Sequence, residues 1–138
     1  MTTLTQKLNQ IKHGWHLIDI KDQILGRNAT QIARLLMGKQ KADYSPNLDM
    51  GDNVIVINTD KLKVTGKKLA NKLYQRHSGW PGGFRELTLG ELMEKDSRKV
   101  VLQAVKGMLP KNKLQDRRLA RLKLFKDDQH PYQAEIKQ

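Results

Sequence analysis

The sequence contains no cysteine, few aromatic residues and far fewer acidic residues than basic ones. Without cysteine, the chain cannot form a disulfide scaffold, a thiolate zinc site or a cysteine nucleophile. No apolar run approaches the roughly 20 residues of a membrane-spanning helix. The start of the chain lacks both the apolar stretch of a signal peptide and the arginines of a mitochondrial presequence. We therefore expect an intracellular-type protein with no membrane partner.

The length of 138 residues is typical of one domain. Apolar residues make up 38% of the sequence, and adding glycine brings the share to the lower edge of the globular range. This share is sufficient for a folded core. We predict a single domain over residues 1–138, with a core at about 15–126, a short N-terminal extension over 1–14 and a C-terminal tail over 127–138.

The excess of 26 basic over 14 acidic residues is concentrated in two segments. Residues 61–85 contain seven basic side chains and no acidic one, and residues 98–126 contain ten against Asp116 alone. Like charges at this density repel one another and destabilise a compact state, whereas a polyanion would neutralise them and release its counterions. The pattern favours a nucleic-acid partner over a solvated surface or an anionic membrane.

Hydrophobic spacing predicts alternating strands and helices. The predicted strands are 15–20, 53–58, 62–65 and 122–125. The predicted helices are 25–37, a short one after Thr88, one from Asp96 or Ser97 to Leu109, and one over 113–121. The strand at 53–58 is continuously β-branched, which is typical of a parallel strand covered on both faces. The order predicts an α/β domain with helices on both faces of a small, mainly parallel sheet.

The sequence offers no catalytic constellation. Complete motifs of hydrolases, metalloproteases and nucleotide-binding loops are absent. The segment 65–68 resembles the end of a phosphate loop but lacks the first glycine of that motif, so a basic turn explains it better. His13 and His16 are separated by a glycine and a strand start, which disfavours a metal site. We predict no enzyme, no cofactor and no metal. The alternative is an enzyme that binds phosphorylated substrates through Lys67 and Lys68.

A glycine-rich loop over 77–83, flanked by Arg76 and Arg85, is suited to RNA. Its glycines let backbone amides approach phosphates, and Trp80 or His77 can stack on a base. A loop with Trp80 folded onto the core is the equally weighted alternative.

Two further basic segments follow. The turn over 107–113 projects two lysines and an amide. In the next helix, Lys113, Arg117 and Arg121 are spaced four residues apart and form a cationic ridge, and arginine binds phosphate oxygens in a bidentate manner.

Seven motifs then occur in a fixed order: Leu25-Gly26-Arg27, Gly38-Lys39-Gln40-Lys41, Tyr44-Ser45-Pro46, Asp49-Met50-Gly51-Asp52, Thr65-Gly66-Lys67-Lys68, His77-Ser78-Gly79-Trp80-Pro81-Gly82-Gly83 and Ala104-Val105-Lys106-Gly107-Met108-Leu109-Pro110-Lys111-Asn112. Together they resemble the L-thirteen family of large-subunit ribosomal proteins, in its bacterial and organellar form, over about residues 15–134.

The resemblance implies a three-layer α/β/α sandwich around a small, mainly parallel sheet, with basic loops and a basic C-terminal helix. It implies a structural role in the large ribosomal subunit: binding of large-subunit rRNA and support of early subunit assembly. The expected partners are this rRNA and neighbouring large-subunit proteins, with no small-molecule substrate and no homo-oligomer. The expected location is the ribosome of a bacterial-type cytoplasm, with an organellar ribosome as the alternative. A nucleic-acid-binding module that acts off the ribosome is the second rival.

From the basic segments and the resemblance we expect RNA contacts at Arg27, Lys39, Lys41, Lys67, Lys68, Lys72, Arg76, His77, Ser78, Gly79, Trp80, Gly82, Gly83, Arg85, Lys106, Lys111, Asn112, Lys113, Arg117, Arg118 and Arg121. The chain departs from the family at Gln115 and Asp116, where a glycine and a basic residue are usual. It also ends early, so contacts of a longer tail are not expected.

Overall fold

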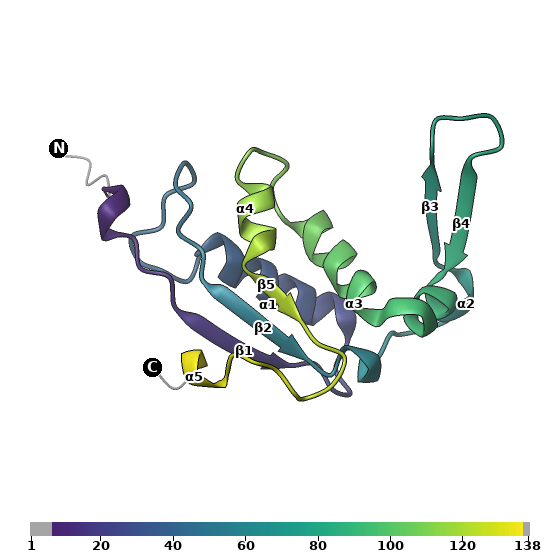
Figure 1. Cartoon of the computed structure of the whole chain (residues 1–138), viewed down its shortest axis with the longest axis horizontal. Coiled ribbons are helices and arrows are strands. Elements are labelled where there is room, and N and C mark those ends of the chain that lie inside the picture. Colours follow the sequence, from purple (N-terminus) through teal and green to yellow (C-terminus); the bar gives the residue numbers. More distant parts are fainter. Residues whose placement is uncertain (1–6, 137–138) are drawn as a thin grey trace.

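The central sheet has three parallel strands. The computed structural model describes residues 7–136. The strands are β1 (Trp15–Asp19), β2 (Asn53–Ile57) and β5 (Leu122–Leu124), in the order β1-β2-β5 (Figure 1). Trp15 pairs with Asn53, and Val54 pairs with Leu122. Residues 1–6 and 137–138, parts of the predicted extension and tail, lie outside the described residues.

Two long helices cover one face of this sheet. Helix α1 (Leu25–Met37) buries an apolar stripe that contacts β2, and α3 (Leu89–Met108) packs against α1. Helix α1 ends at Gly38, whose φ of 81° is the left-handed conformation that glycine adopts without strain. Helix α3 begins with a capping box between Thr88 and Glu91, as the sequence predicts.

The C-terminal segment lies on the opposite face of the sheet. Ile55, which points away from the α1 face, is fully buried. Tyr132 stacks on Trp15 with ring centroids 5.3 Å apart, and it also contacts Phe125. The short helix α5 (Gln133–Ile136) then contacts β1. The burial of β2 on both faces explains its continuous apolar sequence. The predicted α/β fold with a small, mainly parallel sheet is confirmed.

A two-stranded antiparallel hairpin projects from the far end of the body (Figure 1). It consists of β3 (Leu73–His77) and β4 (Phe84–Thr88), and the four-residue helix α2 (Lys68–Asn71) precedes it. The sequence analysis recognised the loop but did not predict β4. The reason is that the outer residues of both strands are exposed, so no apolar alternation marks them.

The two helices predicted after Thr88 are confirmed. Asp96, with a non-helical φ of −163° and ψ of 100°, separates them at a kink within α3, and its carboxylate accepts from Arg98 N at the start of the second. Two further predictions differ from the structure. The predicted strand over 62–65 is only a single bridge between Ile24 and Lys63. The helix predicted over 113–121 is shorter: α4 spans Gln115–Ala120, because the preceding turn continues to residue 114.

Two short 3₁₀ turns, η1 (Leu8–Gln10) and η2 (Thr59–Lys61), complete the described elements. No helix within residues 7–136 has the length and apolar character needed to cross a membrane.

The buried carboxylate of Asp52 connects the start of the chain to the segment before β2. It accepts hydrogen bonds from Gly14 N at 2.9 Å, His16 Nε2 at 2.8 Å and Gln40 Nε2 at 2.8 Å. The Lys41 ammonium lies 2.9 Å from Asp52 Oδ1, the oxygen that also accepts from Gly14 N. Burial by itself raises the pKa of Asp52, but the bonds from His16, Lys41 and Gly14 outweigh it and hold the pKa below its ordinary value.

We predict that Asp52→Asn lowers the free energy of unfolding by about 3 kcal/mol at neutral pH, because it removes the buried negative charge that pairs with Lys41 and replaces one acceptor oxygen by an NH₂ group that faces donors. The pKa of Asp52 is lower in the folded than in the unfolded state, so the carboxylate stabilises the fold above the unfolded value of about 4. This contribution is lost as the pH falls through the folded value. Urea denaturation of both proteins across this range should show the difference narrowing below about pH 4. A constant difference would contradict the assignment.

Candidate nucleic-acid interface

Two arginines lie directly opposite each other on the projecting hairpin. Arg76 of β3 is the cross-strand partner of Arg85 of β4. Like charges in this position destabilise a sheet, and the described residues provide neither guanidinium with an ion pair. Because a two-stranded hairpin is only marginally stable alone, this repulsion has a cost within the free protein. An anion between the two groups would remove it.

The arginine face of the hairpin continues toward the body. Alternation along β3 places Tyr74 on the same face as Arg76, and Leu87 lies opposite Tyr74. Tyr74 and Leu87 pack against the core and so anchor the hairpin. Lys72, just before β3, places its Nζ 5.4 Å from the centre of the Tyr74 ring. Burial raises the pKa of Tyr74, so this residue adds no negative charge to the face.

The tip of the hairpin presents an indole to solvent. Trp80 is 76% exposed, so the alternative in which it folds onto the core is wrong. Local hydrogen bonds shape the loop beneath it: Gly79 N donates to His77 Nδ1 at 2.9 Å, and Ser78 N donates to Gly83 O at 3.2 Å. A Cβ at Gly83 would overlap the Ser78 hydroxyl and lie 2.9 Å from the Trp80 carbonyl oxygen, a backbone atom, so a larger residue there would require the loop to shift.

Most of the other predicted contact residues are exposed. Lys67, Lys68 and Lys72 surround α2 at the base of the hairpin, and Arg27 and Lys106 lie on α1 and α3. On the turn before α4, Asn112 uses its Oδ1 to accept from Leu114 N at 3.0 Å. The remaining exposed members of the predicted set are Lys39, Ser78, Gly79, Gly82, Lys111, Lys113 and Arg117, while Gly83 is half-buried.

Lys41 and Arg121 depart from the prediction because acidic groups of the body hold them. The Lys41 ammonium contacts Asp52 and also donates to Lys12 O at 2.6 Å and Met50 O at 2.7 Å, which uses its three N–H groups. Arg121 makes a bidentate pair with Asp49, with Nη1 to Oδ1 at 2.6 Å, and its side chain is only 16% exposed. We therefore remove both from the candidate interface.

Arg118 departs for a different reason, since its side chain is buried and only 1% exposed. Among the described residues, its Nε and Nη2 have no hydrogen-bond partner. The predicted cationic ridge is also shortened: Lys113 precedes α4, and Arg121 follows its last residue. Within the ridge, only Lys113 and Arg117 keep exposed charges.

Phe84, at the start of β4, is a further residue of the hairpin tip that was not predicted from the sequence. Phe84 lies opposite His77 and is 54% exposed, so a second aromatic ring accompanies Trp80 near the tip. The signal was present in the sequence, because an aromatic residue directly follows the glycine pair. It could have been used only if β4 had been recognised as a strand.

The comparison with known proteins identifies a family and several relatives with one name. The sequence matches the family described as Ribosomal protein L13 over residues 13–131. It is 47% identical to the large ribosomal subunit protein uL13 of Pelobacter propionicus, with 98% of this chain and 95% of the relative covered. The protein of the same name from Thermobifida fusca is 49% identical over 98% of this chain and 91% of the relative. The one from Geobacter sulfurreducens is 46% identical over 97% and 94%.

These matches define the class as structural ribosomal proteins, which are not enzymes, and so exclude the alternative of a phosphate-processing enzyme. The chain belongs to the ribosomal protein L13 family. Its relatives are bacterial, in agreement with the predicted location in the bacterial-type cytoplasmic ribosome.

We predict that Arg118→Met raises the free energy of unfolding by about 2 kcal/mol. Methionine occupies a similar volume and is uncharged. It therefore avoids the cost of burying a guanidinium whose Nε and Nη2 have no hydrogen-bond partner among the described residues. Urea denaturation measures this change, and binding of large-subunit rRNA should stay as in the wild type. A destabilised Arg118→Met protein would show that the guanidinium contributes favourably to the fold.

Proposed function

We propose that this protein binds large-subunit rRNA through the arginine face and the aromatic tip of its hairpin. The observation that carries the proposal is the pair of opposed guanidiniums at Arg76 and Arg85, which the described residues leave without an ion pair. Phosphates supply the negative charge that this face lacks, and arginine binds their oxygens in a bidentate manner. The family membership specifies which RNA is meant.

A second group of contacts extends from the turn at 110–114 onto α4. Lys111, Lys113 and Arg117 are exposed there. Asp116 lies in the first turn of α4, where a negative charge interacts favourably with the helix dipole. This position gives Asp116 a structural reason to stand in a basic segment. Phosphate contacts from both groups hold the RNA by its backbone and shape, and the aromatic tip adds stacking on unpaired bases.

The division between body and hairpin supports a role in early assembly. The body has its own apolar core between the sheet, α1 and α3, so it needs no RNA to fold. A protein that is folded beforehand binds rRNA early and can stabilise the RNA structure onto which other components assemble. We infer that neighbouring large-subunit proteins are its other partners, and that it acts as a single copy.

We predict that the double variant Arg76→Gln, Arg85→Gln weakens binding to deproteinised large-subunit rRNA. The dependence of log affinity on log salt should become shallower by about 1.5, because two phosphate contacts are lost. Filter binding over a series of salt concentrations measures both effects. The thermal stability of the variant should equal or exceed that of the wild type, because a repulsive pair has been removed.

The charge-matched control is Lys21→Gln, Lys95→Gln, which removes two exposed cations outside the candidate interface. This control should retain the wild-type slope. Equal losses in the two double variants would mean that total charge, and not the hairpin, determines binding. Such a result would contradict the proposed site.

We predict that Trp80→Ala lowers rRNA affinity by about tenfold, in the range of base stacking on an aromatic side chain. Its free energy of unfolding should change by no more than about 0.5 kcal/mol, because the indole is exposed. Leu8→Ala, which truncates another exposed apolar residue, is the control and should leave affinity unchanged. A large loss of stability without a loss of affinity would refute the stacking role.

A further inference from the structure

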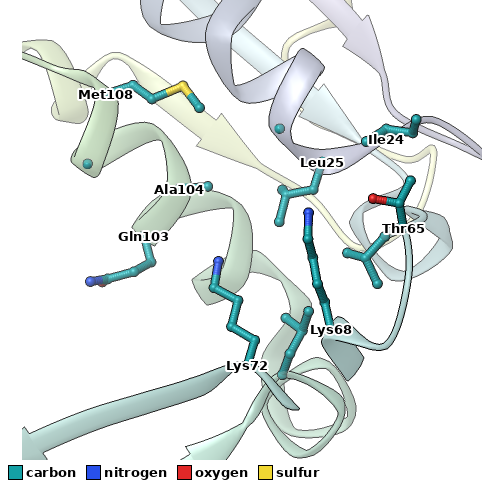
Figure 2. A pocket seen from close by; sticks show the side chains of 12 residues that line it. Ile24, Leu25, Thr65, Lys68, Lys72, Gln103, Ala104 and Met108 are labelled. Carbon is teal, nitrogen blue, oxygen red and sulfur yellow. The ribbon is translucent and has the colours of Figure 1, made fainter. Parts of the chain in front are cut away.

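A cavity of about 290 Å³ lies at the base of the hairpin, between the start of α1, α2 and the end of α3 (Figure 2). Its volume is just below the roughly 300–1,000 Å³ found for small-ligand sites. Leu25, Leu89, Ala104 and Met108 supply apolar walls from two helices. The cavity is therefore large enough for one planar ring system, and its walls suit the faces of such a ring.

The charge of the cavity is of one sign. The ammonium groups of Lys68, at the start of α2, and of Lys72, directly after α2, extend into it, as Figure 2 shows. Among the described residues that line it, none is acidic. Thr65 and Gln103 add a hydroxyl and an amide at its edge. Apolar walls beside two cations and two neutral hydrogen-bonding groups match a ligand that combines a flat ring with a negative charge. A nucleotide has this combination.

The cavity is continuous with the arginine face of the hairpin through Lys72. Lys72 lines the cavity and also lies beside Tyr74, which shares its face with Arg76. An RNA backbone that follows the hairpin toward the body therefore arrives at the opening. Two glycines leave the approach clear: a Cβ at Gly26 or Gly107 would meet no heavy atom within 4 Å.

We propose that this cavity receives one unstacked nucleotide of the bound RNA, with its base against the apolar walls and its phosphate between Lys68 and Lys72. The proposal rests on the proposed rRNA-binding function and adds to it a specific pocket. Thr65 and Gln103 can each donate and accept, so they accommodate the edges of different bases. The cavity therefore binds a nucleotide that has left the base stack, with little preference for which base it carries.

The test fills the cavity without changing its charge. Gly107→Leu places an apolar side chain at the cavity wall, and the open space around Gly107 and the higher helix propensity of leucine preserve the fold. Ala134→Leu adds the same side chain at an exposed position of α5, outside the cavity, and is the matched control. Filter binding to deproteinised large-subunit rRNA is measured at several salt concentrations, with urea denaturation of each variant.

We expect Gly107→Leu to bind rRNA about tenfold more weakly than the wild type. Its salt slope should be unchanged, because no cation is removed, and Ala134→Leu should behave as the wild type. If the wild type binds and Gly107→Leu binds equally well, the nucleotide pocket is refuted while rRNA binding stands. If Gly107→Leu binds rRNA normally but is not incorporated into reconstituted subunits, the occupant is a protein segment, which also overturns the proposal. Failure of the wild type to bind would refute the proposed function itself.

Discussion

The carboxylate of Asp52 gathers donors from the start of the chain, from β1 and from the segment before β2, and the arrangement of the body depends on it. The carboxylate is buried, and without these donors its charge would be costly to remove from water. The pair between Arg121 and Asp49 likewise holds the end of α4. These two carboxylates and the cations that they hold, Lys41 and Arg121, thus neutralise one another and connect separate segments of the body.

In the hairpin, by contrast, the opposed arginines are not neutralised by carboxylates of the described residues. Its strands bury little besides Tyr74 and Leu87, and its arginines face each other without a carboxylate between them. A protein that had only to be stable would gain by replacing one of them. The cost is understandable where a polyanion completes the surface, because the same charge density that destabilises the free hairpin increases the release of counterions on binding. Stability of the body and affinity of the hairpin are therefore provided by different residues.

Regular hydrophobic patterns predicted the body well. The helix over 25–37 and the strands beginning at 15, 53 and 122 lie where their spacing indicated, because each has a face in the core. The hairpin strand β4 was missed, because a strand exposed on most positions has no such pattern. The helix before β5 was predicted too long, because charge spacing alone does not mark where a turn ends and a helix begins. The cavity between α1, α2 and α3 joins segments about 80 residues apart, and no local motif announces it.

Composition and hydrophobic spacing were sufficient to predict the α/β class, the density of positive charge and the two segments that contain it, because these are local properties of the chain. Which cations are free depends on the folded arrangement. Arg121 meets a carboxylate 72 residues away, and Arg118 is buried. Arg76 and Arg85 lie opposite each other, and within residues 7–136 neither forms an ion pair. Whether a charge is neutralised depends on its neighbours in space, and folding places those neighbours together from distant parts of the chain.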